Sequence, residues 1–313
     1  MDIKTITSIL NDVPAKYFVY AIILNTIITV FGALFYKLLF RIQGENLKFS
    51  RSFLILHMAQ FLNFFAPLKT GAIFGKPLIT KLIGNMPLTK SIFAVGFENF
   101  FSISWQLVML PILLMLVGEK ILLNSMLAKI LIAVAALIAI STISRRYKWF
   151  LHYALGLKRF LPDKIKKIAL RFGLNEAAIK ELIESIPSYF SNKRMILALI
   201  LLTALQAFLQ PFFLRWALAF FNVNVSYFSL FAIFWISYIL GRLSFLPSGL
   251  GVKDLTMGGL LIGAKVNSIT AIKTVVLFRA LTFMPFLVIG GALFLYYGHK
   301  YTYKIFFKRD NST

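Results

Sequence analysis

The chain has 313 residues, of which 59% are hydrophobic and only 14% are charged, against about 25% charged residues in an average soluble domain. This composition excludes a water-soluble globular protein, because too few polar side chains are present to cover its surface. The formal charge of +23 comes mostly from bases between apolar runs. The positive-inside rule and anionic lipids explain such bases, so we do not predict a nucleic-acid partner. The absence of cysteine excludes a disulfide or thiolate site, and the three scattered histidines do not have metal-ligand spacing.

Seven long apolar runs follow one another along the chain. They occupy residues 17–40, 53–66, 91–117, 127–143, 195–221, 227–246 and 270–297. A membrane-spanning helix needs about 20 residues, so all except 53–66 and 227–246 are interpreted as full spans. The first run follows a segment without net basic charge, which favours a transmembrane helix over a cleaved signal peptide.

The two remaining runs end where a membrane helix would ordinarily continue. The run 53–66 is short and ends at Pro67, ahead of Gly71. The run 227–246 stops at Pro247, ahead of Gly249 and Gly251. Because proline and glycine interrupt helices, we predict a helix break at each of these places.

The basic connections predict how the helices are oriented. Segment 144–194 carries 12 bases and 4 acids, and the segments 37–51, 69–90 and the C-terminal tail are also basic, so all four are expected in the cytoplasm. The connections near 118–126 and 222–226 carry almost no net charge and are expected outside. Helix 53–66 must then enter and return from the inside, whereas the break after Pro247 lies at the tip of a hairpin that enters from outside.

The chain repeats itself at an offset of 180 residues. This offset aligns Pro67 with Pro247, Gly71 with Gly251, and the span 17–40 with 197–220. Since the two halves have opposite predicted orientations, we predict an all-α, multi-pass membrane helix bundle built as an inverted repeat with two broken, re-entrant hairpins. The alternative is a chance match of two Pro-x-x-x-Gly strings. The predicted organisation is one membrane domain over 1–313: a first repeat (1–117), a connecting span with a basic cytoplasmic segment (118–194), a second inverted repeat (195–297) and a basic cytoplasmic tail (298–313).

Several charged residues lie near these breaks. A charge at the bilayer centre costs about 2.5–3.5 kcal/mol on insertion scales, so each needs a reason. A helix that restarts after a break points free N–H groups at an anion such as phosphate, and glycine lets the backbone approach it closely. We interpret the basic and glycine residues as a binding site for a lipid phosphate headgroup: Arg279, Arg242, Lys253, Lys69, Lys76, Gly249 and Gly251.

The two nearby acids, Glu98 and Asp254, are interpreted as charge-pairing or coupling groups, and Pro67, Gly71 and Pro247 as the helix-break residues. For each charged residue the alternative is a structural ion pair within the membrane. No catalytic or metal-binding set is found, so neither a cofactor nor an enzyme activity is predicted.

Two strings resemble a known family. Tyr-Ile-Leu-Gly-Arg-Leu-Ser-Phe-Leu-Pro-Ser-Gly-Leu-Gly-Val-Lys-Asp at 238–254, followed by Leu-Phe-Arg at 277–279, resembles the C-terminal signature of the lysylphosphatidylglycerol synthase transmembrane region. The usual form is Pro-Gly-Gly-Leu-Gly, an acidic residue and a downstream Arg, and here Ser248 replaces the first Gly. The N-terminal signature departs further, because Ala72 stands where an acid is expected and Asn99 follows Glu98 where Arg is expected.

The resemblance implies a flippase-like protein of the cell membrane that moves lipids between leaflets. In fused members a soluble domain makes the aminoacyl lipid, and no such domain follows residue 297, so synthase activity is not expected. We hypothesise that the protein translocates or binds a phosphate-headgroup lipid and that its partners are anionic membrane lipids. The alternatives are a membrane enzyme acting on a lipid phosphate, and a non-transporting scaffold for a lipid-modifying partner. The sequence does not indicate the oligomeric state.

Overall fold

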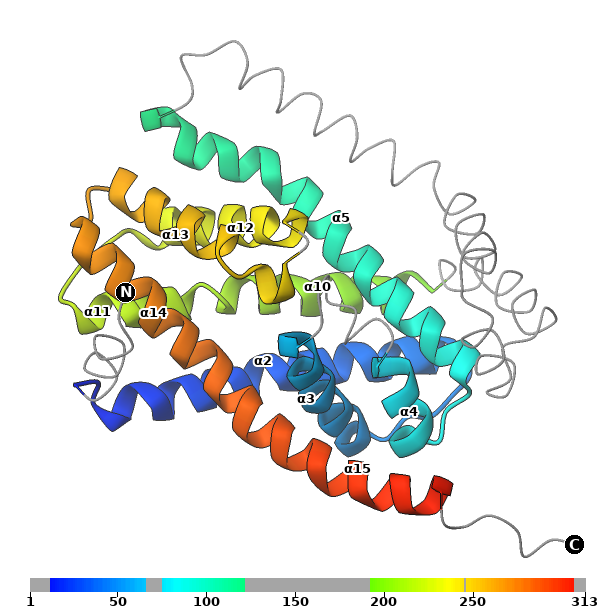
Figure 1. Cartoon of the computed structure of the whole chain (residues 1–313). Coiled ribbons are helices and arrows are strands. Elements are labelled where there is room, and N and C mark those ends of the chain that lie inside the picture. Colours follow the sequence, from blue (N-terminus) through cyan, green and yellow to red (C-terminus); the bar gives the residue numbers. More distant parts are fainter. Residues whose placement is uncertain (1–11, 66–74, 122–191, 245, 307–313) are drawn as a thin grey trace, which may run out of the picture.

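The computed structural model describes residues 12–65, 75–121, 192–244 and 246–306 (Figure 1). Every regular element in these ranges is a helix, so the predicted all-α class is confirmed. Three helical segments of the described chain are long and apolar enough to cross a membrane: Ala15–Ile42, Lys193–Phe220 and Ser268–Gly298. The predicted span 127–143, the first break with Pro67, Lys69 and Gly71, and nearly all of 144–194 lie outside the described residues.

The described residues of the first half form four helices. They are α2 (Ala15–Ile42), α3 (Phe49–Phe65), α4 (Lys76–Gly84) and α5 (Leu88–Ile121). Helix α4 has a proline in its first turn, where the missing N–H leaves no hydrogen bond unmade, and it ends at Asn85 in the left-handed conformation. Helix α5 contains the run 91–117, whose crossing of the bilayer stays a prediction.

The described residues of the second half form shorter elements with more breaks between them. Its elements are α10 (Lys193–Leu209), α11 (Phe212–Phe220), α12 (Tyr227–Leu243), the 3-10 turn η3 (Pro247–Gly249), α13 (Val252–Gly263), α14 (Ser268–Pro285), the π-helical turn η4 (Phe286–Gly290) and α15 (Gly291–Phe306). The side chains of Asn192, Ser226 and Asn267 accept backbone N–H hydrogen bonds at the starts of α10, α12 and α14. These caps explain why the three helices begin at those residues.

The two halves repeat the same order of elements. At the offset of 180 residues, Leu88 at the start of α5 aligns with Ser268 at the start of α14, and Asn85 with Lys265, both of which have positive φ. Contacts between the halves are reciprocal, because α12 packs on α5 while α3 packs on η4 and α15. Reciprocal contacts are what a twofold relation produces, so they support the internal repeat. The opposite orientation of the halves in the membrane stays a prediction.

The helix break at Pro247 is present. After α12 ends, Ser248, Gly249 and Gly251 have φ values of 52°, 66° and 80°, and α13 then turns back alongside α12. Left-handed backbone is freely available only to glycine, which explains two of these three positions. Placement of this helical hairpin within a bilayer stays a prediction.

Glycine also lets the two arms of this hairpin approach closely. A Cβ on Gly241 of α12 would lie 2.7 Å from Cβ of Lys253 on α13, and a Cβ on Gly249 would lie 3.0 Å from Cα of Gly241. A side chain at either position would therefore force the arms apart.

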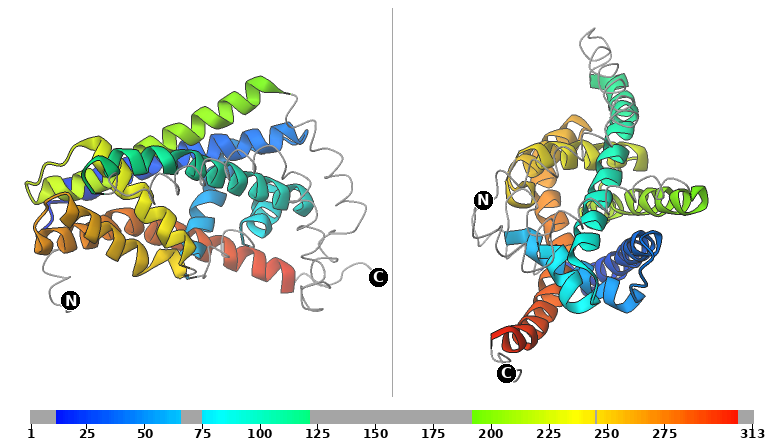
Figure 2. Two further views of the ribbon diagram at one scale, coloured as in Figure 1. Left: turned by 90° about the horizontal axis from the view of Figure 1, so that it is seen from above. Right: turned by 90° about the vertical axis from the view of Figure 1, so that its right-hand side faces the viewer.

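The helices form two apolar cores, one around α11–α14 and the other around α3, α4 and the flanking parts of α2 and α5. Helices α2 and α10 pack along each other (Figure 2). Both expose large apolar side chains on their outer sides, such as Ile23 and Leu201, as expected for surfaces that meet lipid. Members of both cores, including Phe35 and Trp235, line the cavity described next.

Candidate functional site

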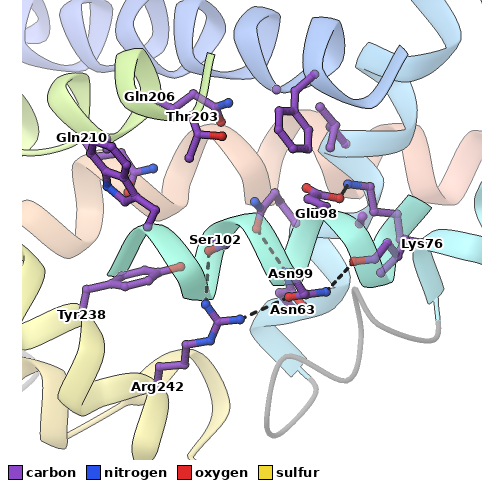
Figure 3. A pocket seen from close by; sticks show the side chains of 18 of the residues that line it. Asn63, Lys76, Glu98, Asn99, Ser102, Thr203, Gln206, Gln210, Tyr238 and Arg242 are labelled. Atoms are coloured by element: carbon purple, nitrogen blue, oxygen red, sulfur yellow. Dashed lines mark hydrogen bonds and ion pairs between the residues drawn. The ribbon is translucent and has the colours of Figure 1, made fainter. Parts of the chain in front are cut away.

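A polar cavity of about 210 Å³ lies among α2, α3, α4, α5, α10 and α12 (Figure 3). Polar side chains in apolar membrane helices are costly and mark functional sites. Those that line this cavity are Gln60 and Asn63 on α3, Lys76 on α4, Glu98, Asn99 and Ser102 on α5, Thr203 and Gln206 on α10, Gln210 at its C-cap, and Tyr238 and Arg242 on α12, together with Trp105 and Trp235.

Helix α10 shows how the apolar sequence forms one polar wall. Thr203, Gln206 and Gln210 recur at i, i+3 and i+7, so they share one face of the helix, and all three line the cavity. The exposed side chains of Leu201 and Leu205 lie on the same helix. Helix α10 thus presents polar groups to the cavity and apolar groups to its surroundings.

Arg242 reaches across the cavity wall from the last turn of α12 to α5. Its Nη1 donates to Ser102 Oγ at 3.2 Å and to Gln106 Oε1 at 3.3 Å, and its Nη2 donates to Asn99 Oδ1 at 3.2 Å. All three acceptors are neutral, and none of the ion pairs found among the described residues includes Arg242. Because a guanidinium stays protonated in proteins, the cavity carries a positive charge that these groups orient but do not neutralise.

A second charged group lies at the α4 end of the cavity. The Lys76 side chain is 3% exposed and pairs with Glu98 of α5, whose side chain is 34% exposed. The Lys76 Nζ also lies 4.0 Å from the ring centroid of Tyr36. Since Lys76 and Glu98 neutralise each other, Arg242 supplies the net charge of the described cavity lining.

A separate charged group holds the helix break. Arg279 on α14 donates from Nε to Asp254 Oδ1 at 2.6 Å and from Nη2 to Asp254 Oδ2 at 2.9 Å. Its Nη1 and Nη2 also lie 3.3 and 3.5 Å from the carbonyl oxygens of Ser248 and Gly249. The second Asp254 oxygen accepts the N–H of Gly251 at 3.1 Å. This Asp254–Arg279 clasp joins the start of α13, the break and α14.

The structure therefore divides the predicted site into two groups. Arg242, Lys76 and Glu98 meet at the cavity. The predicted residues Arg279, Asp254, Gly249, Gly251 and Pro247 gather at the break and are not part of the cavity lining. Direct phosphate binding by Arg279 stays a prediction, and its bidentate pair supports the alternative of a structural ion pair.

Lys253 belongs to neither group. Its side chain lies among aromatic rings, with Nζ 4.8 Å from the Phe278 centroid and 5.3 and 5.4 Å from those of Phe234 and Tyr238. Lysine and aromatic faces attract each other, so these rings stabilise the cation where it lies. Its predicted role in lipid binding is untested.

Sequence reasoning did not identify the neutral part of the site. Asn99, Ser102 and Gln106 hold Arg242, and Gln206 and Gln210 form the opposite wall, yet none carries a charge. Their spacing is the feature of the sequence that could identify them. Polar residues that recur every three or four positions within an apolar run share one helix face, and such a face is expected to border a polar cavity.

The comparison with known families agrees with this architecture. A family described as the lysylphosphatidylglycerol synthase TM region matches residues 1–290. No curated protein matches the chain. The match covers both halves and the strings at 238–254 and 277–279, so the suspected resemblance is confirmed. It identifies a membrane protein linked to lipid biosynthesis or translocation: the chain belongs to the lysylphosphatidylglycerol synthase TM region family.

Proposed function

We propose that this protein moves a phosphate-headgroup lipid between the leaflets of the cell membrane, with the headgroup held in the cavity beside Arg242. The observation that carries the proposal is the guanidinium at the cavity, hydrogen-bonded only to neutral side chains among the described residues. Arg242 is partly buried and has no counter-ion among the described residues, so an anion that enters the cavity is stabilised there.

The geometry of Arg242 suits a phosphate. A guanidinium presents a planar fork of N–H donors that binds two phosphate oxygens at once. The contacts to Ser102, Gln106 and Asn99 fix this fork before any ligand enters, which lowers the entropy lost on binding.

The position of the cavity suits transport. Its lining comes from α2, α3, α4 and α5 of the first half and from α10 and α12 of the second. In transporters built from repeats, rocking of one half against the other exposes a site between them to each side in turn. The proposal is for transport rather than catalysis, with anionic lipids as cargo and the C-terminus in the cytoplasm.

Leaflet exchange tests the proposal. The purified protein is reconstituted in phosphatidylcholine vesicles with a trace of acyl-labelled fluorescent phosphatidylglycerol, and dithionite bleaches the label exposed outside. We expect the protein to accelerate bleaching of the inner-leaflet label. Loss of a hydrogen bond to a charged group is worth about 1.5–3 kcal/mol, so Arg242→Gln should slow exchange roughly 10- to 150-fold. The exchange rate of Arg242→Lys should lie between those of the wild type and Arg242→Gln, because lysine keeps the charge but lacks the planar fork of N–H donors.

The matched control is Arg215→Gln on α11, which removes an exposed arginine that does not line the cavity. It should exchange lipid at the wild-type rate. A wild-type protein that leaves exchange unchanged, or an Arg242→Gln variant as fast as wild type, would show that the proposed function is wrong.

A further inference from the structure

The elements α14, η4 and α15 follow one another as one long helical rod, orange to red in Figure 1, whose hydrogen-bonding pattern changes midway. The stretch Ser268–Gly298 of this rod is long and apolar enough to cross a membrane. Pro285 is the last residue of α14, and the π-helical turn Phe286–Gly290 follows it directly. Helices bend most often at a proline or a π-bulge, and π-turns occur frequently at functional sites. The rod thus has both features in succession inside its apolar stretch.

Pro285 frees a backbone acceptor, and a side chain of α2 bonds to it. In a regular α-helix the carbonyl oxygen of Leu281 accepts the N–H of residue 285, which proline lacks. Asn25, a buried residue of α2, donates from Nδ2 to this oxygen at 3.4 Å. A buried amide is costly unless it is hydrogen-bonded, so the two groups satisfy each other. A bond to a neighbouring helix here replaces a bond within the rod.

The two arms of the rod pack on different parts of the fold. Helix α14 packs on α11 and α13 of the second half and on α2, whereas η4 and α15 pack on α3 of the first half. The contact with α3 is close, because a Cβ on Gly290 would lie 2.6 Å from His57 O and one on Gly291 would lie 3.1 Å from Phe61 Cε2. Since packed interiors transmit displacement, a movement of α15 displaces α3 with it.

Helix α3 connects this rod to the cavity. It carries Gln60 and Asn63, which line the cavity and whose side chains are hydrogen-bonded to each other at 3.2 Å. Arg242 is held by α5, so a displacement of α3 changes the position of the two amides relative to the guanidinium. Domain movements use a few residues at the ends of elements as hinges, and Pro285 and η4 occupy such a position.

We infer that Pro285 and η4 form a hinge, held by Asn25, at which α15 and α3 move together relative to α14 when access to the cavity changes. This inference rests on the proposed function and names its moving parts. Bending at this point breaks no hydrogen bond between residues 281 and 285, because proline has already removed that bond. The bond from Asn25 limits the motion, since a carbonyl without a donor in an apolar environment is costly.

Amide hydrogen exchange tests the hinge without a transport assay. In detergent micelles, residues 286–290 of the wild-type protein should exchange faster than residues 272–281 of α14. Pro285→Ala restores one backbone hydrogen bond, which is worth roughly 2- to 10-fold in an equilibrium, so exchange at 286–290 should slow by that factor. The control is Pro14→Ala at the exposed start of α2, where the missing N–H breaks no helical hydrogen bond. Equal exchange in the two segments, or no slowing by Pro285→Ala, would overturn the hinge.

A double-mutant cycle tests the role of Asn25. In the wild-type background Asn25→Leu removes the donor to Leu281 O and should raise the equilibrium constant for unfolding roughly 2- to 10-fold. In the Pro285→Ala background residue 285 supplies its own N–H, so the same substitution should not destabilise the protein. The control is Thr26→Val, whose exposed hydroxyl donates to Ile22 O of the same helix and whose effect should be equal in both backgrounds. An equal loss of stability from Asn25→Leu in both backgrounds would show that Asn25 does not hold the hinge.

Leaflet exchange connects the hinge with transport. Two cysteines three residues apart are joined by a short bis-alkylating reagent, in a chain without native cysteine. Met284→Cys with Leu287→Cys spans the hinge, whereas Ile269→Cys with Ile272→Cys is the matched pair within α14, and all four side chains are exposed. Pro285→Ala should slow lipid exchange roughly 2- to 10-fold, and the cross-link at the hinge should slow it at least as much. The cross-link within α14 should leave the rate unchanged.

The outcomes keep the two proposals apart. If the wild-type protein exchanges lipid but Pro285→Ala and the cross-link at the hinge leave the rate unchanged, the inference fails and the proposed function stands. If the wild-type protein does not exchange lipid, the proposed function fails, and the role of the hinge in changing access fails with it. Amide exchange and the double-mutant cycle then decide whether the hinge itself exists.

Discussion

Removal of the Asp254–Arg279 clasp should lower the stability of the fold, and not only weaken lipid binding. The Arg279 side chain is 13% exposed and that of Asp254 is 26% exposed, and they share two hydrogen bonds of 2.6 and 2.9 Å. An exposed ion pair contributes about 0–1 kcal/mol, whereas breaking a buried one costs about 3–5 kcal/mol. The clasp is mostly buried, so we expect Arg279→Met to lower the free energy of unfolding by about 2–3 kcal/mol, between these limits.

A double-mutant cycle isolates the pair. Arg279→Met leaves Asp254 unpaired, and the second change, Asp254→Asn, removes the charge that has lost its partner. The double variant should therefore lose less stability than the two single variants together, with a coupling energy of about 1–2 kcal/mol. Unfolding is followed by tryptophan fluorescence as sodium dodecyl sulfate is titrated into detergent micelles, and leaflet exchange is measured on the same samples.

Two results would refute this reasoning. If the two substitutions have additive effects, the residues do not interact as the structure shows. If Arg279→Met unfolds like wild type but no longer exchanges lipid, then Arg279 binds the headgroup itself, as the sequence predicts. Arg279→Lys is the conservative test, because lysine keeps the charge but cannot make the bidentate pair.

Two further predictions concern packing and topology. Gly290→Ala should cost about 1–3 kcal/mol in unfolding, since its Cβ would lie 2.6 Å from His57 O, whereas Gly298→Ala, with no atom within 4 Å, should cost nothing measurable. Equal stability of the two variants would contradict the close α3–η4 contact. Leu250→Cys puts a thiol at the break, at a side chain that is 49% exposed in a chain without native cysteine. A membrane-impermeant maleimide should label it from outside the cell, and labelling from inside alone would exclude the inverted hairpin.

Local features of the sequence predicted the helices and the break well. The run 17–40 became α2, because length and apolarity are enough to specify a membrane helix. Pro247 and the glycines after it predicted the break, because their backbone restrictions act within a few residues. The pairing of Asp254 with a nearby base could also be anticipated. Asp254 lies in the first turn after the break, and Arg279 lies on the next helix of the chain.

The sequence could not predict which charges would share a cavity. Arg242 and Arg279 both lie near the break, yet one joins α5 across 136–143 residues of chain and the other pairs with Asp254 only 25 residues away. The partners of these two arginines depend on which helices pack together, and a local sequence pattern does not predict that packing. Charge also gives no indication of Gln210, which lines the cavity at the C-cap of α10.

The structure gives a physical reason for the sequence's departure from the family pattern at Asn99. The offset of 180 aligns Asn99 with Arg279, and the family resemblance leads us to expect an arginine at both positions. Asn99 Oδ1, however, accepts a hydrogen bond from Arg242 Nη2 at 3.2 Å. An arginine side chain has no acceptor and would add a second positive charge beside the first. Asparagine therefore holds Arg242 in place without competing with it, so one half supplies the positive charge and the other supplies the neutral groups that orient it.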